Sequence, residues 1–250
     1  ATTEIYTLSL HDALPICANF EGVKSDEHGM ISDELCKKLK LLQDSEEHYK
    51  FIYTVPDFQN PSGVTWSTER RKNLINASEK YNIIVVDDSP YRELRFEGEK
   101  PPALGTLTND NNVITLRSFS KIFSPGLRLG WIVAHPQIIK KLSVAKQSVD
   151  LCANSLGQLI AAEFLKEGLL EAHVQKICSM YKEKRDAMLN ALEKYMPQDS
   201  EIRWVKPEGG LFMWLKLPKK INTTEMFPEA VEKKVAYVIG SAFHCDGSGQ

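Results

Sequence analysis

The segment that decides the fold reads Ser118-Phe119-Ser120-Lys121-Ile122-Phe123-Ser124-Pro125-Gly126-Leu127-Arg128. It connects two short runs, at 113–116 and 129–133, whose composition is typical of β-strands. Lys121 and Arg128 both lie in this connection, and a loop with two such charges can form a pocket for a small anion. The spacing alone is weak evidence, because lysines and arginines in loops are usually solvated.

Two further segments follow upstream strands. Asn60-Pro61-Ser62-Gly63 comes after a β-rich run at 51–55, and Asp88-Ser89-Pro90-Tyr91 comes after an apolar run at 83–86. Each segment alone also fits an ordinary turn. In this order the three segments resemble those of the fold type I aminotransferases of class I/II, which depend on pyridoxal 5′-phosphate (PLP). The chain resembles most the branch with the 2-aminoadipate and kynurenine aminotransferases, over roughly residues 18 to 250.

Strands that alternate with helices predict an α/β fold, with a mostly parallel sheet and helices on both faces. The resemblance implies a partial PLP-binding large domain at 18–172 and part of a smaller α+β C-terminal domain at 173–250. Residues 1–17 match nothing expected of the family. They are either a translated artefact or a true N-terminal extension, and they are excluded from the prediction of the fold.

The apolar run at 83–86 shows no alternation, which predicts a strand covered on both faces. Ser67 and Thr68 are candidate N-caps for a helix that continues to Tyr81. The remaining predicted elements are strands at 113–117, 129–134, 202–205 and 211–217 and helices at 136–149, 155–166, 169–195 and 224–235.

Composition excludes several classes of function. The chain has 250 residues, 42% of them hydrophobic, and a net charge of −2, so we expect no general attraction to nucleic acid or to anionic lipid. Its five cysteines are scattered, and its six histidines lack zinc-ligand spacing, so we expect free thiols and no metal site. No apolar run approaches the roughly 20 residues that span a bilayer, and cytoplasmic localisation is expected.

Lys121 is the first candidate for catalysis. A deprotonated amine can form a covalent bond with the cofactor's aldehyde, and nearby cations and desolvation favour that form. Once a substrate displaces it, the amine can transfer a proton at the substrate's Cα as general base and acid.

The resemblance assigns the other candidate residues. Asp88, the acid three residues before the tyrosine, faces the pyridine nitrogen and keeps it protonated; for the adjacent Asp87 we prefer a turn-capping role. Tyr91 and Asn60 hydrogen-bond the ring's phenolic oxygen, and a cis bond before Pro61 is expected.

The cofactor's phosphate is the expected ligand of three further residues. Arg128 would bind it through the planar guanidinium, Ser118 would donate a hydrogen bond, and Ser120 is a weaker candidate. Pro207–Trp214 resembles a segment that closes over the substrate. Its glycines fit either close backbone approach or an ordinary bulge or turn.

Parts of the family pattern are missing from the chain: an N-terminal phosphate loop with a stacking aromatic, and a C-terminal arginine for the substrate carboxylate. The chain therefore resembles the middle of a larger protein. We expect exposed apolar area, modest stability of the isolated chain and a homodimer at full length.

The predicted function is transfer of an amino group from an L-amino acid to a 2-oxo acid such as 2-oxoglutarate. The donor stays open among 2-aminoadipate, aromatic and branched-chain amino acids. Two alternatives stay open: the PLP-sensing domain of a MocR-type transcription regulator, and a PLP-dependent C–S lyase, which the fold does not distinguish from an aminotransferase.

Overall fold

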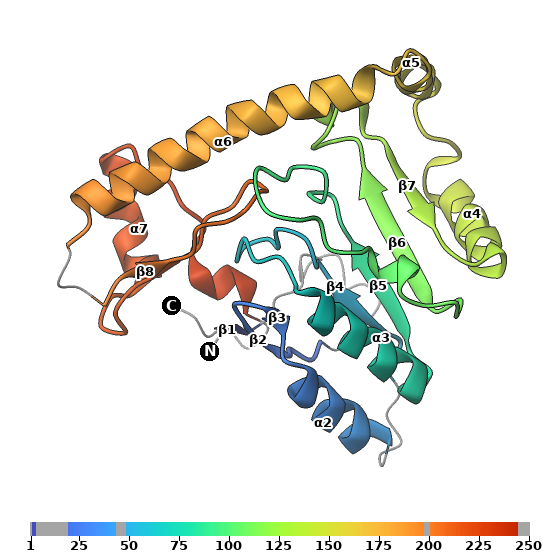
Figure 1. The fold of residues 1–250 in the computed structure, drawn as a ribbon, viewed down its shortest axis with the longest axis horizontal. Helices are drawn as coiled ribbons and strands as arrows, with labels where there is room; N and C mark the ends of the chain where they lie inside the picture. The colour runs from blue at the N-terminus through green and yellow to red at the C-terminus, as the bar shows by residue number, and fades with distance from the viewer. Residues whose placement is uncertain (1, 4–19, 44–48, 198–200, 245–250) are drawn as a thin grey trace.

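The computed structural model describes residues 2–3, 20–43, 49–197 and 201–244. Its centre is a four-stranded sheet in the order β4-β5-β6-β7 (Figure 1). The strands are β4 (Phe51–Thr54), β5 (Ile84–Asp88), β6 (Val113–Ser118) and β7 (Gly130–Val133). The first three are parallel, whereas β7 runs antiparallel to β6. The predicted α/β fold with a mostly parallel sheet is confirmed.

Helix α3 (Thr68–Tyr81) makes the crossover from β4 to β5. Its start is fixed by Ser67, whose Oγ accepts a hydrogen bond from the backbone N–H of Arg70 at 3.2 Å. It ends at Asn82, which adopts the left-handed conformation that often terminates helices. The helix therefore has the bounds that the sequence predicts, with Ser67 and not Thr68 as the cap.

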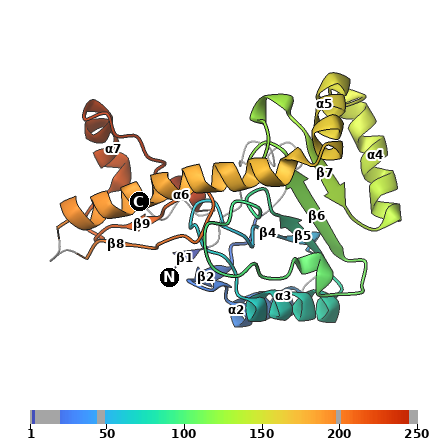
Figure 2. The same cartoon turned by 45° about the horizontal axis from the view of Figure 1, so that its top comes forward.

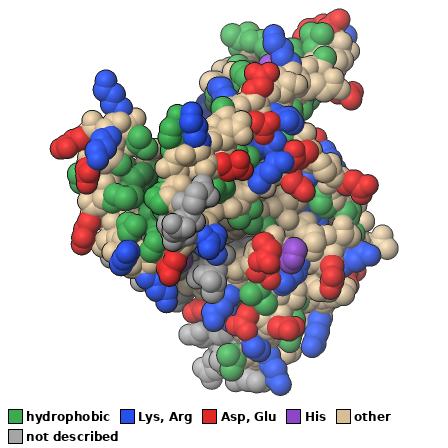
Figure 3. All heavy atoms as spheres, turned by 60° about the vertical axis from the view of Figure 1, so that its left-hand side comes forward, with side chains coloured by type: hydrophobic (Ala, Val, Ile, Leu, Met, Phe, Trp, Pro, Cys, Tyr) green, Lys and Arg blue, Asp and Glu red, His purple; other side chains and the backbone are tan. Residues whose placement is uncertain are grey.

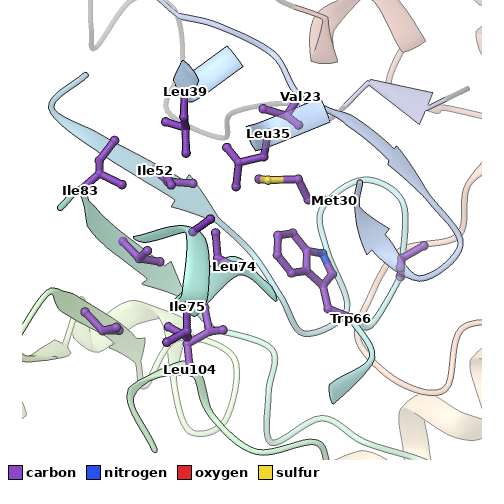
Figure 4. Packing of buried hydrophobic residues seen from close by; sticks show 14 residues of the cluster. Val23, Met30, Leu35, Leu39, Ile52, Trp66, Leu74, Ile75, Ile83 and Leu104 are labelled. Carbon is purple, nitrogen blue, oxygen red and sulfur yellow. The ribbon is translucent and has the colours of Figure 1, made fainter. Parts of the chain in front are cut away.

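The largest hydrophobic cluster lies between the sheet and helices α2 (Ser32–Gln43) and α3 (Figure 4). Trp66 and Val85 are fully buried there, and Leu74 is 2% exposed. Burial of such side chains stabilises the fold by about 1.5–3 kcal/mol each. This side of the sheet is the well-packed core of the chain.

A small antiparallel sheet precedes α2, formed by β1 (Thr2–Thr3), β2 (Lys24–Asp26) and β3 (Gly29–Met30). Residues 4–17, within the segment whose origin the sequence leaves open, lie outside the described residues.

Three helices follow β7: α4 (Pro136–Asp150), α5 (Ser155–Lys166) and α6 (Leu169–Tyr195). They agree with the predicted helices. Figures 1 and 2 show α6 on the opposite side of the sheet from α2 and α3.

The C-terminal residues form the pair β8 (Arg203–Trp204) and β9 (Leu215–Lys216), then α7 (Thr223–Glu232). The predicted strand at 211–217 is wrong over most of its length. Gly209 instead forms an isolated bridge with Arg95, and Gly210 turns the chain with a φ of +74°. Short 3₁₀ turns lie at Leu104–Thr106 (η2), Pro125–Leu127 (η3) and Gly240–Phe243 (η4).

The prediction that the run at 83–86 is covered on both faces is wrong in part. Burial alternates along β5: Val85 and Asp87 are buried, whereas Ile84, Val86 and Asp88 are half-buried. The face toward α3 is packed, and the other face is less fully covered.

Apolar side chains are exposed at the other edge of the sheet. All four residues of β7 are exposed, including Trp131 and Ile132, and α4 contains no buried residue. This agrees with the exposed apolar area that the sequence predicts. On the face drawn in Figure 3, acidic and basic side chains are interspersed around hydrophobic ones.

Within the described ranges no helix combines the length and the apolar character that crossing a bilayer requires. The same ranges hold no cluster of metal-binding side chains, and Cys36, Cys152 and Cys178 are free thiols.

Candidate cofactor site

The predicted site residues follow neighbouring strands at one end of the sheet. Asp88 ends β5 and pairs in register with Leu116, two residues before Ser118 ends β6. Ser118 in turn pairs with Gly130 of β7. The connection 119–129, which carries Lys121, therefore begins and ends at the same end of the sheet. The carboxyl ends of parallel strands are where α/β proteins bind ligands.

Asp88 is held by a residue that no sequence motif indicates. The hydroxyl of Tyr53, on β4, donates a hydrogen bond of 2.5 Å to Asp88 Oδ2. Burial raises the pKa of Asp88 above its usual value, although this hydrogen bond and the charge of Arg117 act in the opposite direction. Arg117 itself donates to the backbone carbonyl of Ser89 at 3.1 Å.

The neighbouring acid, Asp87, has a different environment. Its side chain is buried, because successive residues of a strand face opposite sides of the sheet. The Ser89 hydroxyl donates to Asp87 Oδ1, and burial raises the pKa of Asp87. A turn-capping acid accepts from a backbone N–H, but this contact joins two side chains, and the Ser89 N–H donates to the Leu116 carbonyl at 3.2 Å instead. The described contacts of Asp87 therefore do not include the turn cap that the sequence predicts.

Tyr91 is 7% exposed and lies close to Asp88. Burial, together with the negative charge of Asp88, raises the pKa of Tyr91 to about 12. The phenol is therefore a hydrogen-bond donor at neutral pH. Its ring packs edge-on against Phe212 at a centroid distance of 5.3 Å.

Asn60 begins a tight turn with the predicted cis bond to Pro61. The backbone N–H of Gly63 donates to the carbonyl of Gln59 at 2.7 Å, which closes the turn. The carboxamide of Asn60 is partly exposed and makes no hydrogen bond to any residue that the structure describes. It is therefore available to a ligand.

Lys121 is half-buried, and within the described ranges its amine takes part in no ion pair or hydrogen bond. Aromatic residues on both sides of it are packed: Phe119 contacts Trp131 at 4.8 Å, and Phe123 stacks on Phe164 of α5 at 4.4 Å between ring centroids. These contacts anchor the loop while the amine stays unpaired.

Of the predicted phosphate ligands, Ser120 and Arg128 lie on this loop, and Ser118 ends β6 directly before it. The Ser118 Oγ accepts a hydrogen bond from the backbone N–H of Ser120 at 3.0 Å, which leaves its hydroxyl hydrogen free to donate. Arg128 is exposed and has a left-handed φ of +53°. Its Nη1 lies 3.5 Å from the Pro125 carbonyl, a weak contact that leaves the guanidinium available to an anion.

A buried ion-pair network lies beneath this site. Arg71 Nη2 lies 2.8 Å from Asp57 Oδ1, and Arg92 Nη1 lies 2.9 Å from Asp57 Oδ2. Burial pushes the pKa of Asp57 upward, but the two guanidinium groups outweigh it and lower the pKa overall. Asp57 lies three residues before Asn60, and Arg92 follows Tyr91, so the network joins two predicted ring-binding segments.

The glycine-containing segment at 207–212 lies against these segments. A Cβ added at Gly209 would lie 2.3 Å from the carbonyl oxygen of Leu94, and one at Gly63 would lie 3.0 Å from the carbonyl of Phe212. Gly210 N–H donates to the Leu94 carbonyl at 2.8 Å. The structure shows both roles predicted for these glycines: close backbone approach at Gly209 and a turn at Gly210.

Tyr53, Arg117 and the Asp57 network are not among the site residues that the sequence predicts. Tyr53 and Asp88 are 35 residues apart, and Asp57 lies 14 residues from Arg71. Only strand register and helix packing bring such pairs together, so no local motif indicates them.

The side chains that could bind a ligand indicate the class of protein: an α/β domain in which a loop with an amine and a guanidinium lies beside a half-buried acid. The groups fit PLP. An amine without a partner among the described residues suits its aldehyde, a hydrogen-bonded carboxylate suits its ring nitrogen, and a guanidinium with one weak backbone contact suits its phosphate.

The chain belongs to the family Aminotransferase class I and II, whose model matches residues 16–250, and this family depends on PLP. It is 47% identical over 224 residues to the aromatic-amino-acid aminotransferase 1 of Thermococcus litoralis, covering 90% of this chain and 53% of that protein. The chain thus spans about half the length of the curated relatives it matches.

A solved structure of LysN, the α-aminoadipate aminotransferase of Thermus thermophilus complexed with N-(5′-phosphopyridoxyl)-L-leucine, has the same fold. It matches with a TM-score of 0.84 and 39% identity, over 91% of this chain and 57% of that one. The chain is also 32% identical over 232 residues to the uncharacterized HTH-type transcriptional regulator YisV of Bacillus subtilis, covering 92% of this chain and 46% of that protein.

Proposed function

We propose that this chain belongs to a PLP-dependent enzyme that transfers an amino group from an L-amino acid to a 2-oxo acid. The observation that carries the proposal is the placement of Asp88 and the Lys121 loop at adjacent carboxyl ends of β5 and β6. An acid, an amine and a guanidinium at one end of a sheet are what binding of PLP and proton transfer beside it require.

Lys121 carries the central role in this proposal. Its amine would hold the cofactor's aldehyde and, when an amino acid displaces it, would move a proton from the substrate's Cα. When bound, PLP supplies an electron-withdrawing ring that accepts the electron pair released at Cα.

The other predicted residues would orient the cofactor. Asp88 would accept a hydrogen bond from the ring nitrogen and keep its proton in place. Tyr91, protonated at neutral pH, and Asn60 would donate to the phenolic oxygen.

The anionic end of the cofactor would be held by the Lys121 loop. Arg128 would bind the phosphate with its planar guanidinium, and Ser118 would donate its hydroxyl hydrogen, with Ser120 as a further donor.

The names of the relatives support an aromatic or 2-aminoadipate donor. We propose glutamate and 2-oxoglutarate as the co-substrate pair, with a donor of 2-aminoadipate, aromatic or branched-chain type. We further propose that residues 18–172 belong to the cofactor-binding domain, that 173–250 belong to a smaller α+β domain, and that the whole protein is a homodimer.

The test is amino transfer by the whole protein loaded with PLP, measured by mass spectrometry of the products from a panel of amino donors with 2-oxoglutarate. Glutamate should form with at least one donor class. Lys121→Ala should abolish it, and Lys141→Ala, which removes an exposed lysine of α4, should leave it unchanged. No glutamate from any donor would count against the proposal.

A PLP-sensing domain of a transcription regulator is the second candidate, supported by the similarity to YisV. Both candidates predict PLP bound at Lys121, so binding does not separate them. Turnover separates the two candidates. A sensor would bind PLP and an amino acid without releasing a 2-oxo acid, whereas the enzyme would release one molecule of 2-oxo acid for each amino group transferred.

A further inference from the structure

Tyr53 lies on the same face of the sheet as Asp88. It pairs in parallel register with Val86, two residues before Asp88, so the side chains of Tyr53, Val86 and Asp88 share one face. The tyrosine is 8% exposed, and its ring packs in a cluster with Val55 and Tyr91. Packing thus fixes the direction in which its hydroxyl points.

The hydroxyl makes a specific contact with one of the two carboxylate oxygens. It donates to Asp88 Oδ2, whereas Asp88 Oδ1 accepts no hydrogen bond from any residue in the described ranges. Three titratable or charged groups act on this carboxylate: Tyr53 from β4, Arg117 from β6 and Tyr91 from the following turn. Of these, Tyr53 is the one that donates a hydrogen bond to Asp88.

The Tyr53 hydrogen bond favours the ionised form of the half-buried Asp88 carboxylate. Removal from water favours its neutral form, and a hydrogen bond to the charged form opposes this. A neutral Asp88 would not keep a proton on a ring nitrogen, and a carboxylate free to rotate would not present one oxygen in a fixed direction.

We propose that Tyr53 is a positioning residue of the cofactor site, whose hydroxyl holds Asp88 Oδ2, favours the ionised carboxylate and leaves Oδ1 for the nitrogen of the cofactor ring. The cofactor part of this inference rests on the proposed function.

The test compares Tyr53→Phe with Tyr81→Phe in the whole protein. Both variants lose one phenolic oxygen and keep the ring. Tyr81 is half-buried at the end of α3, packed on the core on the other side of the sheet. A thermal melt of each variant checks that the fold is kept.

The first readout is the ionisation of Asp88 without cofactor, by carboxyl ¹³C NMR during a pH titration, with the signal assigned by its loss in Asp88→Asn. Tyr53→Phe should move the midpoint of Asp88 to higher pH, and Tyr81→Phe should leave it in place. An unchanged midpoint in Tyr53→Phe would overturn the inference whatever the activity.

The second readout is kinetic. Tyr53→Phe should lower kcat about tenfold with little change in KM, because the hydrogen bond acts on the electron demand of the ring and not on substrate binding. The pH profile of kcat should shift in the same variant. A kcat and pH profile equal to those of the wild type would overturn the cofactor role.

The two proposals fail in different ways. If the wild-type protein binds no PLP, the proposed function fails and the cofactor role of Tyr53 fails with it. The wild type could instead bind PLP and transfer amino groups while Asp88 titrates at the same pH in the wild type, Tyr53→Phe and Tyr81→Phe. In that case only the inference about Tyr53 fails.

Discussion

The two halves of the sheet differ in how their functional groups are held. On the β4–β5 side, Asp57 is paired with two arginines, and Asp88 is hydrogen-bonded by Tyr53. On the β6–β7 side, Lys121 and Arg128 lie on a loop beside an exposed strand, with no ion pair to a described residue.

This contrast indicates that the two sides of the proposed site bind the cofactor in different ways. The groups for the cofactor ring are preorganised by buried contacts within the chain. Lys121 and Arg128, the groups for the aldehyde and the phosphate, form no ion pair with any described residue, so an anionic ligand would stabilise this loop by binding. We therefore expect substitutions on the first side to change the stability of the protein and substitutions on the second side to change its ligand binding.

The largest effect on stability is expected for Arg71→Ala. It leaves the buried Asp57 with one of its two partners, and breaking a buried ion pair costs about 3–5 kcal/mol. The matched control is Arg70→Ala on the same helix, whose partly exposed pair with Asp26 is worth about 1 kcal/mol or less. Urea unfolding measures the free energy of unfolding of both variants. Equal losses of stability would show that the buried network stabilises the fold no more than the partly exposed pair does.

A pair of large-to-small substitutions compares the packing of the two sides. Leu74→Ala, in the core beneath β4 and β5, should lower the free energy of unfolding by about 2–5 kcal/mol. Val149→Ala, at an exposed position of α4, should change it by about 0.5 kcal/mol or less in the isolated chain. A comparable loss at Val149 would show that the α4 surface is covered in solution.

Gly209→Ala tests the close approach of the 207–212 segment to the site. Its Cβ would overlap the Leu94 carbonyl, and relief of such crowding costs about 1–3 kcal/mol. Gly105→Ala is the control, since its Cβ would meet Thr115 at an ordinary contact distance of 3.6 Å. If the two alanine variants melt at the same temperature, the segment does not pack as described.

The smallest effect is a change in acid sensitivity. The pKa of Asp57 is lowered in the folded protein, so its contribution to stability is present above the usual carboxyl pKa and is lost as the pH falls through the folded value. In Asp57→Asn the decline of the unfolding free energy with falling pH should be shallower. A slope equal to that of the wild type would show that Asp57 does not titrate differently on unfolding.

The sequence predicts local structure better than long-range contacts. Helices α5 and α6 have the predicted bounds, because periodicity and end signals are local. The strand predicted at 211–217 shrinks to two residues, since the contact of Gly209 with Arg95 redirects the chain. The site motifs follow predicted strands, so a shared end of the sheet could be inferred, whereas the contacts of Asp57 and Tyr53 depend on register between distant residues.

The most direct measurement of the central claim is the location of bound cofactor. The whole protein is incubated with PLP and reduced with borohydride, which fixes a cofactor bound to an amine, and is then digested for mass spectrometry. The account predicts a phosphopyridoxyl group on Lys121, and none on any peptide of Lys121→Ala. A label on a different lysine, or an unlabelled wild-type protein, would contradict it.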